Sequence, residues 1–244
     1  MLHEQTVTML NALRLAGMAR GFADRIGDPK HAELDHADFV GLLAQDEKTY
    51  RENRRLGRLL KNAKLKVAAC LEDADYRHPR GLDKAVVREL ASGRWIEAKR
   101  NVILTGPTGI GKTWLGNALG NQAARAGHTT LYVRAPRLFE SLRQAQGDGT
   151  HMRFLARLAK VEALVIDDLL LTPLAEQERR DLLEIVEDRH QAGSTVITSQ
   201  CPLKEWHAAI GDPTLADAIL DRLVHNAYKI ALKGPSMRGK EEAS

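Results

Sequence analysis

The stretch that decides the fold reads Gly106-Pro107-Thr108-Gly109-Ile110-Gly111-Lys112-Thr113. It fits the pattern G-x-x-x-x-G-K-[ST] in full, and its glycines let backbone N–H groups curl around a polyphosphate without Cβ clashes. An apolar run at 102–105 precedes it, and a helical pattern that includes Trp114 begins at Lys112. The positive end of that helix faces the same anion. The alternative is a plain strand–turn–helix connection.

The chemistry of the loop assigns roles to its last residues. We expect Lys112 to reach the β- and γ-phosphates of ATP and Thr113 to place its hydroxyl on Mg²⁺. We expect residues 106–113, with Trp114, to form the nucleotide-binding site.

A second motif follows at Asp167-Asp168, directly after the apolar run 163–166. A buried strand that ends in an acid delivers it to the edge of the sheet where ligands bind. We expect Asp167 to hold Mg²⁺ and Asp168 to polarise the attacking water as a general base. The alternative is a strand that simply ends in Asp at a turn.

The residues around these motifs alternate between short β-branched runs and helical stretches. Such alternation predicts an α/β fold with a five-stranded parallel sheet covered by helices on both faces. The expected strands are 102–105, 129–133, 161–167, 195–199 and 228–232, and the expected helices are 112–126, 137–146, 177–191 and 215–225.

The strand at 195–199 runs into Gln200. In this sheet type that strand lies between the phosphate-loop strand and the acidic strand. The amide of Gln200 can both donate and accept, so it can sense the γ-phosphate and orient water. The alternative is a polar exit from the strand.

Two arginines are further candidates. Arg222 could be an arginine finger that reaches the γ-phosphate of a neighbouring subunit. Its alternative is an intrahelical pair with Asp221 or Asp217, which would contribute little stability. Arg238, in the stretch 234–238, is a weaker candidate for contacting nucleotide.

The first 70 residues have helical texture, with a break at 27–29 and one or two long helices over 38–67. We place a helical DNA-binding and assembly domain at 1–72, a connecting segment at 73–100 within an ATPase domain at 73–238, and a flexible tail at 239–244.

A basic stripe runs along the expected long helix. Between residues 48 and 66 the chain has eight basic residues and one acid, Glu52. At about 100° per residue, seven of them fall in one arc of roughly 140°. A charged helix face is usually solvated surface, but charge of one sign favours a polyanion. The expected DNA-binding residues are Lys48, Arg51, Arg54, Arg55, Arg58, Lys61 and Lys66.

Composition sets bounds on the function. The chain has 244 residues with 43% hydrophobic residues, a net charge of +4 and only 5% aromatic residues, so base-stacking platforms are not expected to dominate. Its two cysteines, Cys70 and Cys201, have no metal-like spacing. With no signal-peptide core and no apolar run that could span a membrane, we expect a cytoplasmic protein with no membrane partner.

Further residues extend the pattern over nearly the whole chain, and together they resemble the IstB-like family of insertion-sequence transposition helpers, which are AAA+ ATPases related to DnaC helicase loaders. The residues that carry the resemblance are Asn62-Ala63-Lys64-Leu65, Gly81-Leu82-Asp83-Lys84, Gly93-Arg94-Trp95-Ile96, Ser199-Gln200, Trp206, Asp217-Ala218-Ile219-Leu220-Asp221-Arg222-Leu223, Leu232-Lys233-Gly234 and Ser236-Met237-Arg238.

The resemblance implies an AAA+ core behind a small helical domain, ATP-driven homo-oligomerisation on duplex DNA with little sequence preference, and cooperation with a cognate transposase. It favours Arg222 as the finger and Gln200 as a sensor. The pair Asp167-Asp168 departs from the Asp-Glu pair common in AAA+ enzymes, and the shorter second side chain predicts slow hydrolysis. The alternatives are a DnaC-type helicase loader, which would prefer single strands, and a small-molecule kinase, for which the sequence shows no obvious lid.

Overall fold

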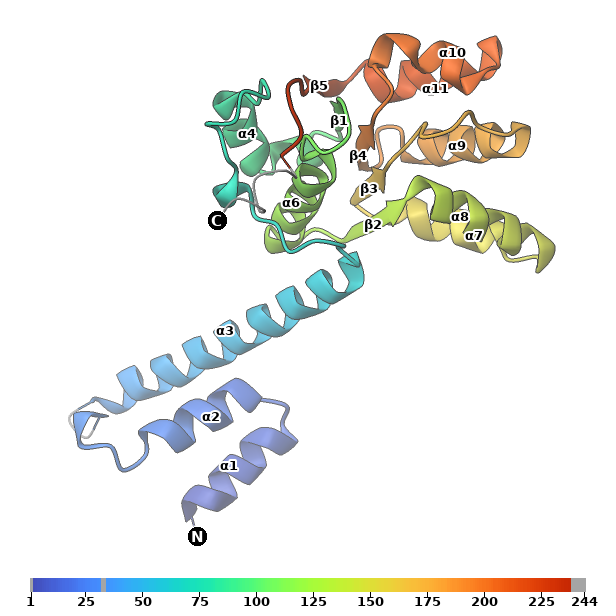
Figure 1. Cartoon of the computed structure of the whole chain (residues 1–244). Helices are drawn as coiled ribbons and strands as arrows, with labels where there is room; N and C mark the ends of the chain where they lie inside the picture. Colours follow the sequence, from blue (N-terminus) through green and yellow to red (C-terminus); the bar gives the residue numbers. More distant parts are fainter. Residues whose placement is uncertain (1, 32–33, 238–244) are drawn as a thin grey trace. The chain divides into compact units, whose positions relative to one another are not determined.

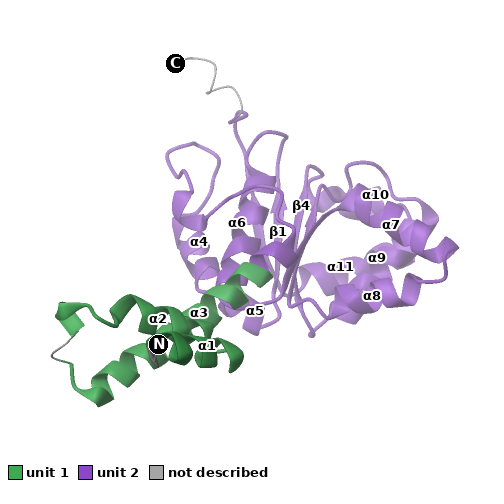
Figure 2. Ribbon diagram, turned by 90° about the horizontal axis from the view of Figure 1, so that it is seen from below, with its two compact units in different colours: residues 1–58 green, residues 59–244 purple. Residues whose placement is uncertain are grey.

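The computed structural model describes residues 2–31 and 34–237. The chain divides into two compact units, residues 1–58 and 59–244 (Figure 2). This division lies earlier than the expected boundary near residue 72. The reason is that residues just after the long helix, among them Ala69 and Leu71, are buried in the core of the second unit.

The second unit is built on a five-stranded parallel sheet with the order β2-β3-β4-β1-β5. The predicted parallel α/β sheet is therefore confirmed, and β4 lies between β1 and β3 as expected. The strands are β1 (Asn101–Thr105), β2 (Thr130–Arg134), β3 (Ala163–Asp167), β4 (Ser194–Ser199) and β5 (Ala227–Ala231).

Helices cover both faces of this sheet (Figure 1). Successive side chains of a strand point to opposite faces. Accordingly Ile103 packs in the core shared with α7 to α11, whereas Val102 and Leu104 pack in the core shared with α4 to α6. The helices are α4 (Lys84–Ala91), α5 (Arg94–Glu97), α6 (Lys112–Arg125), α7 (Ala135–Gly147), α8 (His151–Ala159), α9 (Glu176–Arg189), α10 (Trp206–Ile210) and α11 (Pro213–Val224), with single 3₁₀ turns at Leu71–Asp73 and Leu203–Glu205.

Both α8 and α10 lie outside the helices predicted from the sequence. Helix α8 is nine residues long and α10 only five. Helices this short are marginal alone and depend on packing. In α8, Leu155 and Leu158 are buried against the sheet's core, as is Trp206 of α10. Tertiary contacts, rather than local pattern, therefore set these two elements.

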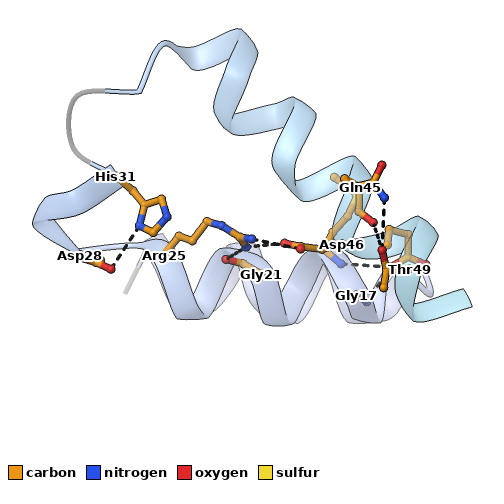
Figure 3. Close-up of polar contacts among 10 residues, drawn as sticks. Gly17, Gly21, Arg25, Asp28, His31, Gln45, Asp46 and Thr49 are labelled. Atoms are coloured by element: carbon orange, nitrogen blue, oxygen red, sulfur yellow. Dashed lines mark hydrogen bonds and ion pairs between the residues drawn. The ribbon is translucent and has the colours of Figure 1, made fainter. Parts of the chain in front are cut away.

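The first unit holds α1 (Leu2–Ala12), α2 (Ala16–Arg25), a 3₁₀ turn at Pro29–His31 and the first part of α3 (His36–Ala63). Helices α2 and α3 approach each other closely because Gly17 and Gly21 present no side chain there. The buried carboxylate of Glu47 accepts hydrogen bonds from the backbone N–H of Gly17 and Met18 at 2.7 and 3.1 Å. Arg25 on α2 also pairs with Asp46 on α3 (Figure 3).

A stability prediction follows from this approach. A Cβ at Gly17 would lie 2.6 Å from the Cα of Glu47, a backbone atom that cannot move aside alone. We expect Gly17→Ala to destabilise the first unit by about 1–3 kcal/mol, the usual cost of overpacking. Hydrogen exchange of the amides in α2 and α3 measures this local stability.

The matched control is Gly41→Ala in α3, where an added Cβ meets nothing within 4 Å. Alanine should slow exchange there, since it favours an exposed helix over glycine by up to about 1 kcal/mol. Equal exchange rates in the two variants would contradict the close-packing account of α2 and α3.

Helix α3 ends at Ala63, earlier than the expected 38–67. Lys64 has a φ of 52°, in the left-handed region, which turns the chain out of the helix. The backbone N–H of Lys66 then donates to Oδ1 of Asn117 at 2.8 Å. The prediction that Lys66 continues the basic face of the long helix is therefore wrong. Within the described residues, no helix has the length and apolarity needed to cross a bilayer.

Candidate nucleotide-binding site

The loop at 106–113 joins the end of β1 to the start of α6. Gly106, Gly109 and Gly111 have φ values of 145°, 77° and 92°, which favour glycine over any L-residue. A Cβ at these three positions would lie 2.1 to 2.5 Å from the C-terminal segment or from Arg80. The sequence thus folds locally into a glycine-rich bend at the N-terminus of α6, the arrangement that binds phosphate.

Lys112 is the charged group of the bend. Its side chain is nearly buried, and Nζ donates to the carbonyl oxygen of Pro107 at 2.7 Å. This bond holds the ammonium group of Lys112 at the loop, where we expect that group to contact the terminal phosphates of ATP.

Asp167, at the end of β3, is fully buried and lies directly beside the phosphate loop. Its carboxylate accepts from the hydroxyl of Thr113 at 2.9 Å. It also accepts from Tyr132 at 2.7 Å and from Thr198 at 2.6 Å. Three hydroxyl donors from α6, β2 and β4 therefore hold the carboxylate in one orientation. Burial raises the pKa of the Tyr132 phenol, and the hydrogen bond between Tyr132 and Asp167 raises it further. The phenol therefore remains a donor.

These groups fit a magnesium ion. Mg²⁺ prefers oxygen ligands and is usually bound through one or two carboxylates together with substrate phosphates. Asp167 and Thr113 supply a carboxylate and a hydroxyl within hydrogen-bond distance of each other. Among the residues that the structure describes, no group of three or more His, Cys, Asp or Glu could hold a metal alone. A magnesium ion here would therefore depend on the nucleotide for further ligands.

Asp168 follows with a φ of 60°, an uncommon conformation for a residue other than glycine. Its backbone N–H donates to the hydroxyl of Thr198 at 3.0 Å, and its carboxylate accepts from Nη2 of Arg134 at 2.9 Å. The ion pair raises the pKa of Arg134. Asp168 therefore projects from the strand end as a carboxylate with its own cationic partner.

The nucleotide cavity is a hollow of about 680 Å³ in front of the loop. Of the expected site residues, it is lined by Thr108, Gly109, Gly111, Lys112, Thr113, Trp114, Asp168 and the exposed Gln200. The expected residues Gly106, Pro107, Ile110 and Asp167 are not among those that line it. Side chains from the segment before β1 also line it, among them Lys66 and Val67. The remaining lining residues are Asp73, Asp75, Arg80, Arg134, Leu171 and Met237.

Arg80 contacts the backbone of the loop and supports it, a role not predicted from the sequence. It is 2% exposed, and its Nη1 donates to the carbonyl oxygen of Ile110 at 3.2 Å and contacts Sδ of Met237 at the same distance. Burial lowers the pKa of its guanidinium, which the carboxylate of Asp75 partly opposes. The backbone N–H of Met237 also donates to Gly109 at 2.9 Å, so the C-terminal segment closes over the loop.

Arg222 lies away from this cavity. Its carbonyl oxygen accepts from Asn101, the first residue of β1, so Arg222 is at the opposite end of the strands. Its guanidinium pairs with Glu187 of α9 at 2.8 Å and donates to the carbonyl of Ala218. Arg222 therefore pairs with neither Asp221 nor Asp217, and it does not reach the nucleotide cavity of its own chain.

The residues predicted to bind DNA are all exposed. Arg51 donates to the buried Glu47 at 2.6 Å, so its charge is partly engaged within the first unit. Arg54 lies over the ring of Tyr50, 5.8 Å from its centroid. Arg238 and the expected tail at 239–244 lie outside the described residues.

Four residues of the site were missed from the sequence: Thr198, Tyr132, Arg134 and Arg80. The strand order offered a signal for two of them. β2 pairs with β3 in the register Arg134 to Asp167, so polar side chains near the end of β2 must meet the acidic pair. Thr198 stands one residue before the end of β4, beside the predicted Gln200. No local pattern marks Arg80, whose place depends on tertiary packing.

Known proteins resemble this chain over nearly its whole length. The family model described as "IstB-like ATP binding protein" matches residues 8–244. An insertion-sequence ATP-binding protein of Sinorhizobium fredii, y4pL, is 49% identical over 238 residues, which are 98% of this chain and 97% of the relative. The IS21 ATP-binding protein of Pseudomonas aeruginosa is 33% identical over 241 residues, 99% of this chain and 91% of the relative.

Solved structures show the same fold. The crystal structure of DnaI superposes with a TM-score of 0.56 at 24% identity, covering 67% of this chain and 90% of that one. The DnaC helicase loader gives a TM-score of 0.55 at 17% identity, covering 68% and 97%. At these identities the likeness supports the AAA+ architecture of the sheet and its helices.

Proposed function

The chain belongs to the IstB-like ATP-binding family and is an AAA+ ATPase, and from that premise we propose that it assembles on duplex DNA in an ATP-dependent way and stimulates a partner transposase. The observation that carries the proposal is the meeting of Thr113 with the buried Asp167 beside the glycine bend. The relatives are named as ATP-binding proteins of insertion sequences, which supports a role in transposition.

Different residues of the chain have different roles in the proposed hydrolysis of ATP. The bend and Lys112 hold the phosphates, and Thr113 and Asp167 would hold Mg²⁺, which neutralises charge on the phosphates when bound. Asp168 orients and polarises the attacking water, and Gln200 is placed at the cavity to orient it further. The guanidinium of Arg134 also holds the carboxylate of Asp168, because its Nη2 donates to Oδ2 at 2.9 Å.

The position of Arg222 explains why hydrolysis would require assembly. The nucleotide cavity has no contribution from Arg222 of the same chain, whereas an arginine beside the γ-phosphate accelerates transfer strongly. We propose that Arg222 exchanges Glu187 for the nucleotide of a neighbouring subunit. Each site would then be complete only in the oligomer.

The proposed DNA surface is the basic face of α3. Lys48, Arg55 and Arg58 are exposed on it, and charge of one sign favours the phosphate backbone over specific bases. Little sequence preference is therefore expected.

Light scattering with and without ATP and duplex DNA tests the assembly. The account expects a large increase in mass only when both are present, and less increase as salt rises, because screening weakens phosphate contacts. A mass that never changes would contradict the proposal. Assembly on single strands in preference to duplex would instead favour the alternative, a DnaC-type helicase loader.

A further inference from the structure

A second cavity, of about 560 Å³, lies beside β2 in the second unit. β2 is an edge strand of the sheet, so its outer side faces no other strand. The cavity is formed by the segment after α3, by β2, and by helices α7 and α8. We call it the β2 groove, and its lining residues fall into a cationic set and an apolar set.

The cationic set has five members and gives the groove its charge. None of the described residues that line the groove is acidic. The apolar set forms most of the remaining wall, including Leu131, Val133 and Leu158. The cationic set is Lys64, Lys66, Arg134, Arg137 and Arg157.

The fold holds these cations in place. The left-handed turn at Lys64 ends α3, and the bond from Lys66 N–H to Asn117 fixes the next residues on α6. Arg157 lies in the last turn of α8, with its guanidinium carbon 4.7 Å from the ring centroid of Phe154. This cation–π contact orients the charge without neutralising it.

The cations of the groove are mostly without acidic partners. Arg134 pairs with Asp168. For Lys64, Lys66, Arg137 and Arg157, no ion pair to any described residue is found. Collecting charge of one sign in a concave surface costs self-repulsion, which an anionic ligand relieves.

We propose that the β2 groove binds the sugar–phosphate backbone of DNA, as a contact surface of the ATPase unit in addition to the basic face of α3. The proposal rests on the proposed function. The repeated phosphates of a DNA strand match the several cations of the groove. The aromatic residues that line the groove are Tyr132 and Phe154, and the guanidinium of Arg157 lies over the ring of Phe154. The groove thus favours backbone contacts over base stacking.

The groove adjoins the nucleotide cavity. Lys66 and Arg134 line both hollows. The other three cations line the groove and are not among the residues of the nucleotide cavity. Arg137 and Arg157 can therefore be changed to test DNA binding without removing a side chain from the ATP site.

The experiment compares two double variants of the full chain. Arg137→Ala with Arg157→Ala removes two charges from the groove, whereas Arg143→Ala with Arg153→Ala removes two exposed charges from the same helices outside the groove. Fluorescence anisotropy with a labelled duplex, in the presence of ATP, gives the affinity at several salt concentrations. Binding of a fluorescent ATP analogue checks that each variant is folded.

We expect the groove variant to bind duplex more weakly, with a plot of log affinity against log salt that is shallower by about 1.8, the value for two lost phosphate contacts. The control variant should keep the wild-type slope. A groove variant with the wild-type slope, or an equal loss in the control, would overturn the groove proposal while leaving the proposed function intact. Failure of the wild type to bind either duplex or single strands would overturn both.

Discussion

An Asp168→Asn protein is expected to bind ATP with nearly wild-type affinity and to hydrolyse it about 100- to 10,000-fold more slowly, the range for loss of a general base. Asp168 lines the nucleotide cavity beside the phosphate loop, and asparagine keeps its size while removing its basic oxygen. The amide can still accept a hydrogen bond from Arg134, so local packing should persist.

Two measurements separate chemistry from binding here. Phosphate release under saturating ATP reports turnover, and calorimetric titration of ATP reports affinity. The matched comparison is Asp167→Asn, which removes the fully buried carboxylate that contacts Thr113 and should weaken magnesium-dependent binding itself. Unchanged turnover in Asp168→Asn would remove Asp168 from its proposed role.

Arg222→Ala is expected to lower turnover by about 1,000-fold or more, as for other arginine fingers, with little change in ATP affinity of the isolated subunit. The reason is its position: the guanidinium lies with Glu187 at the end of the strands opposite to the phosphate loop. A residue there can act on nucleotide only in another subunit.

Mixing variants tests action between subunits. An Arg222→Ala subunit keeps its own phosphate loop, and a Lys112→Ala subunit keeps its own Arg222. Neither should hydrolyse ATP alone, but a mixture should recover activity where the first receives the finger of the second. Glu187→Ala serves as a control, because it removes the resting partner of Arg222 and should leave turnover intact. A mixture that stays inactive would contradict a finger supplied by a neighbour.

The sequence predicts those parts of the site that are formed by residues adjacent to one another in the chain. The phosphate loop needs glycine conformations at fixed spacing, and β3 needs an apolar run before Asp167, so both are visible without coordinates. The confirmed sheet follows from the alternation of such runs with helices. The order of β1, β4 and β3 follows from the sheet type.

The parts that were missed depend on contacts between distant segments. Arg80 supports Ile110 across 30 positions of sequence, and Tyr132 meets Asp167 only because β2 and β3 are neighbours. Helical periodicity alone predicted that the helix with its basic face continues beyond Ala63, where α3 ends. The end of α3 depends instead on Asn117, more than 50 residues later, which binds the chain at Lys66.

The central claim is that a triphosphate and its metal lie between the bend at 106–113 and Asp167. A crystal grown with Mn²⁺ and a non-hydrolysable ATP analogue tests this directly, because manganese replaces magnesium and gives an anomalous signal. The account predicts one strong peak within coordination distance of the Thr113 hydroxyl and near the carboxylate of Asp167, with phosphate density against the loop amides. A manganese peak elsewhere, or nucleotide density outside the cavity that Lys112 and Asp168 line, would contradict it.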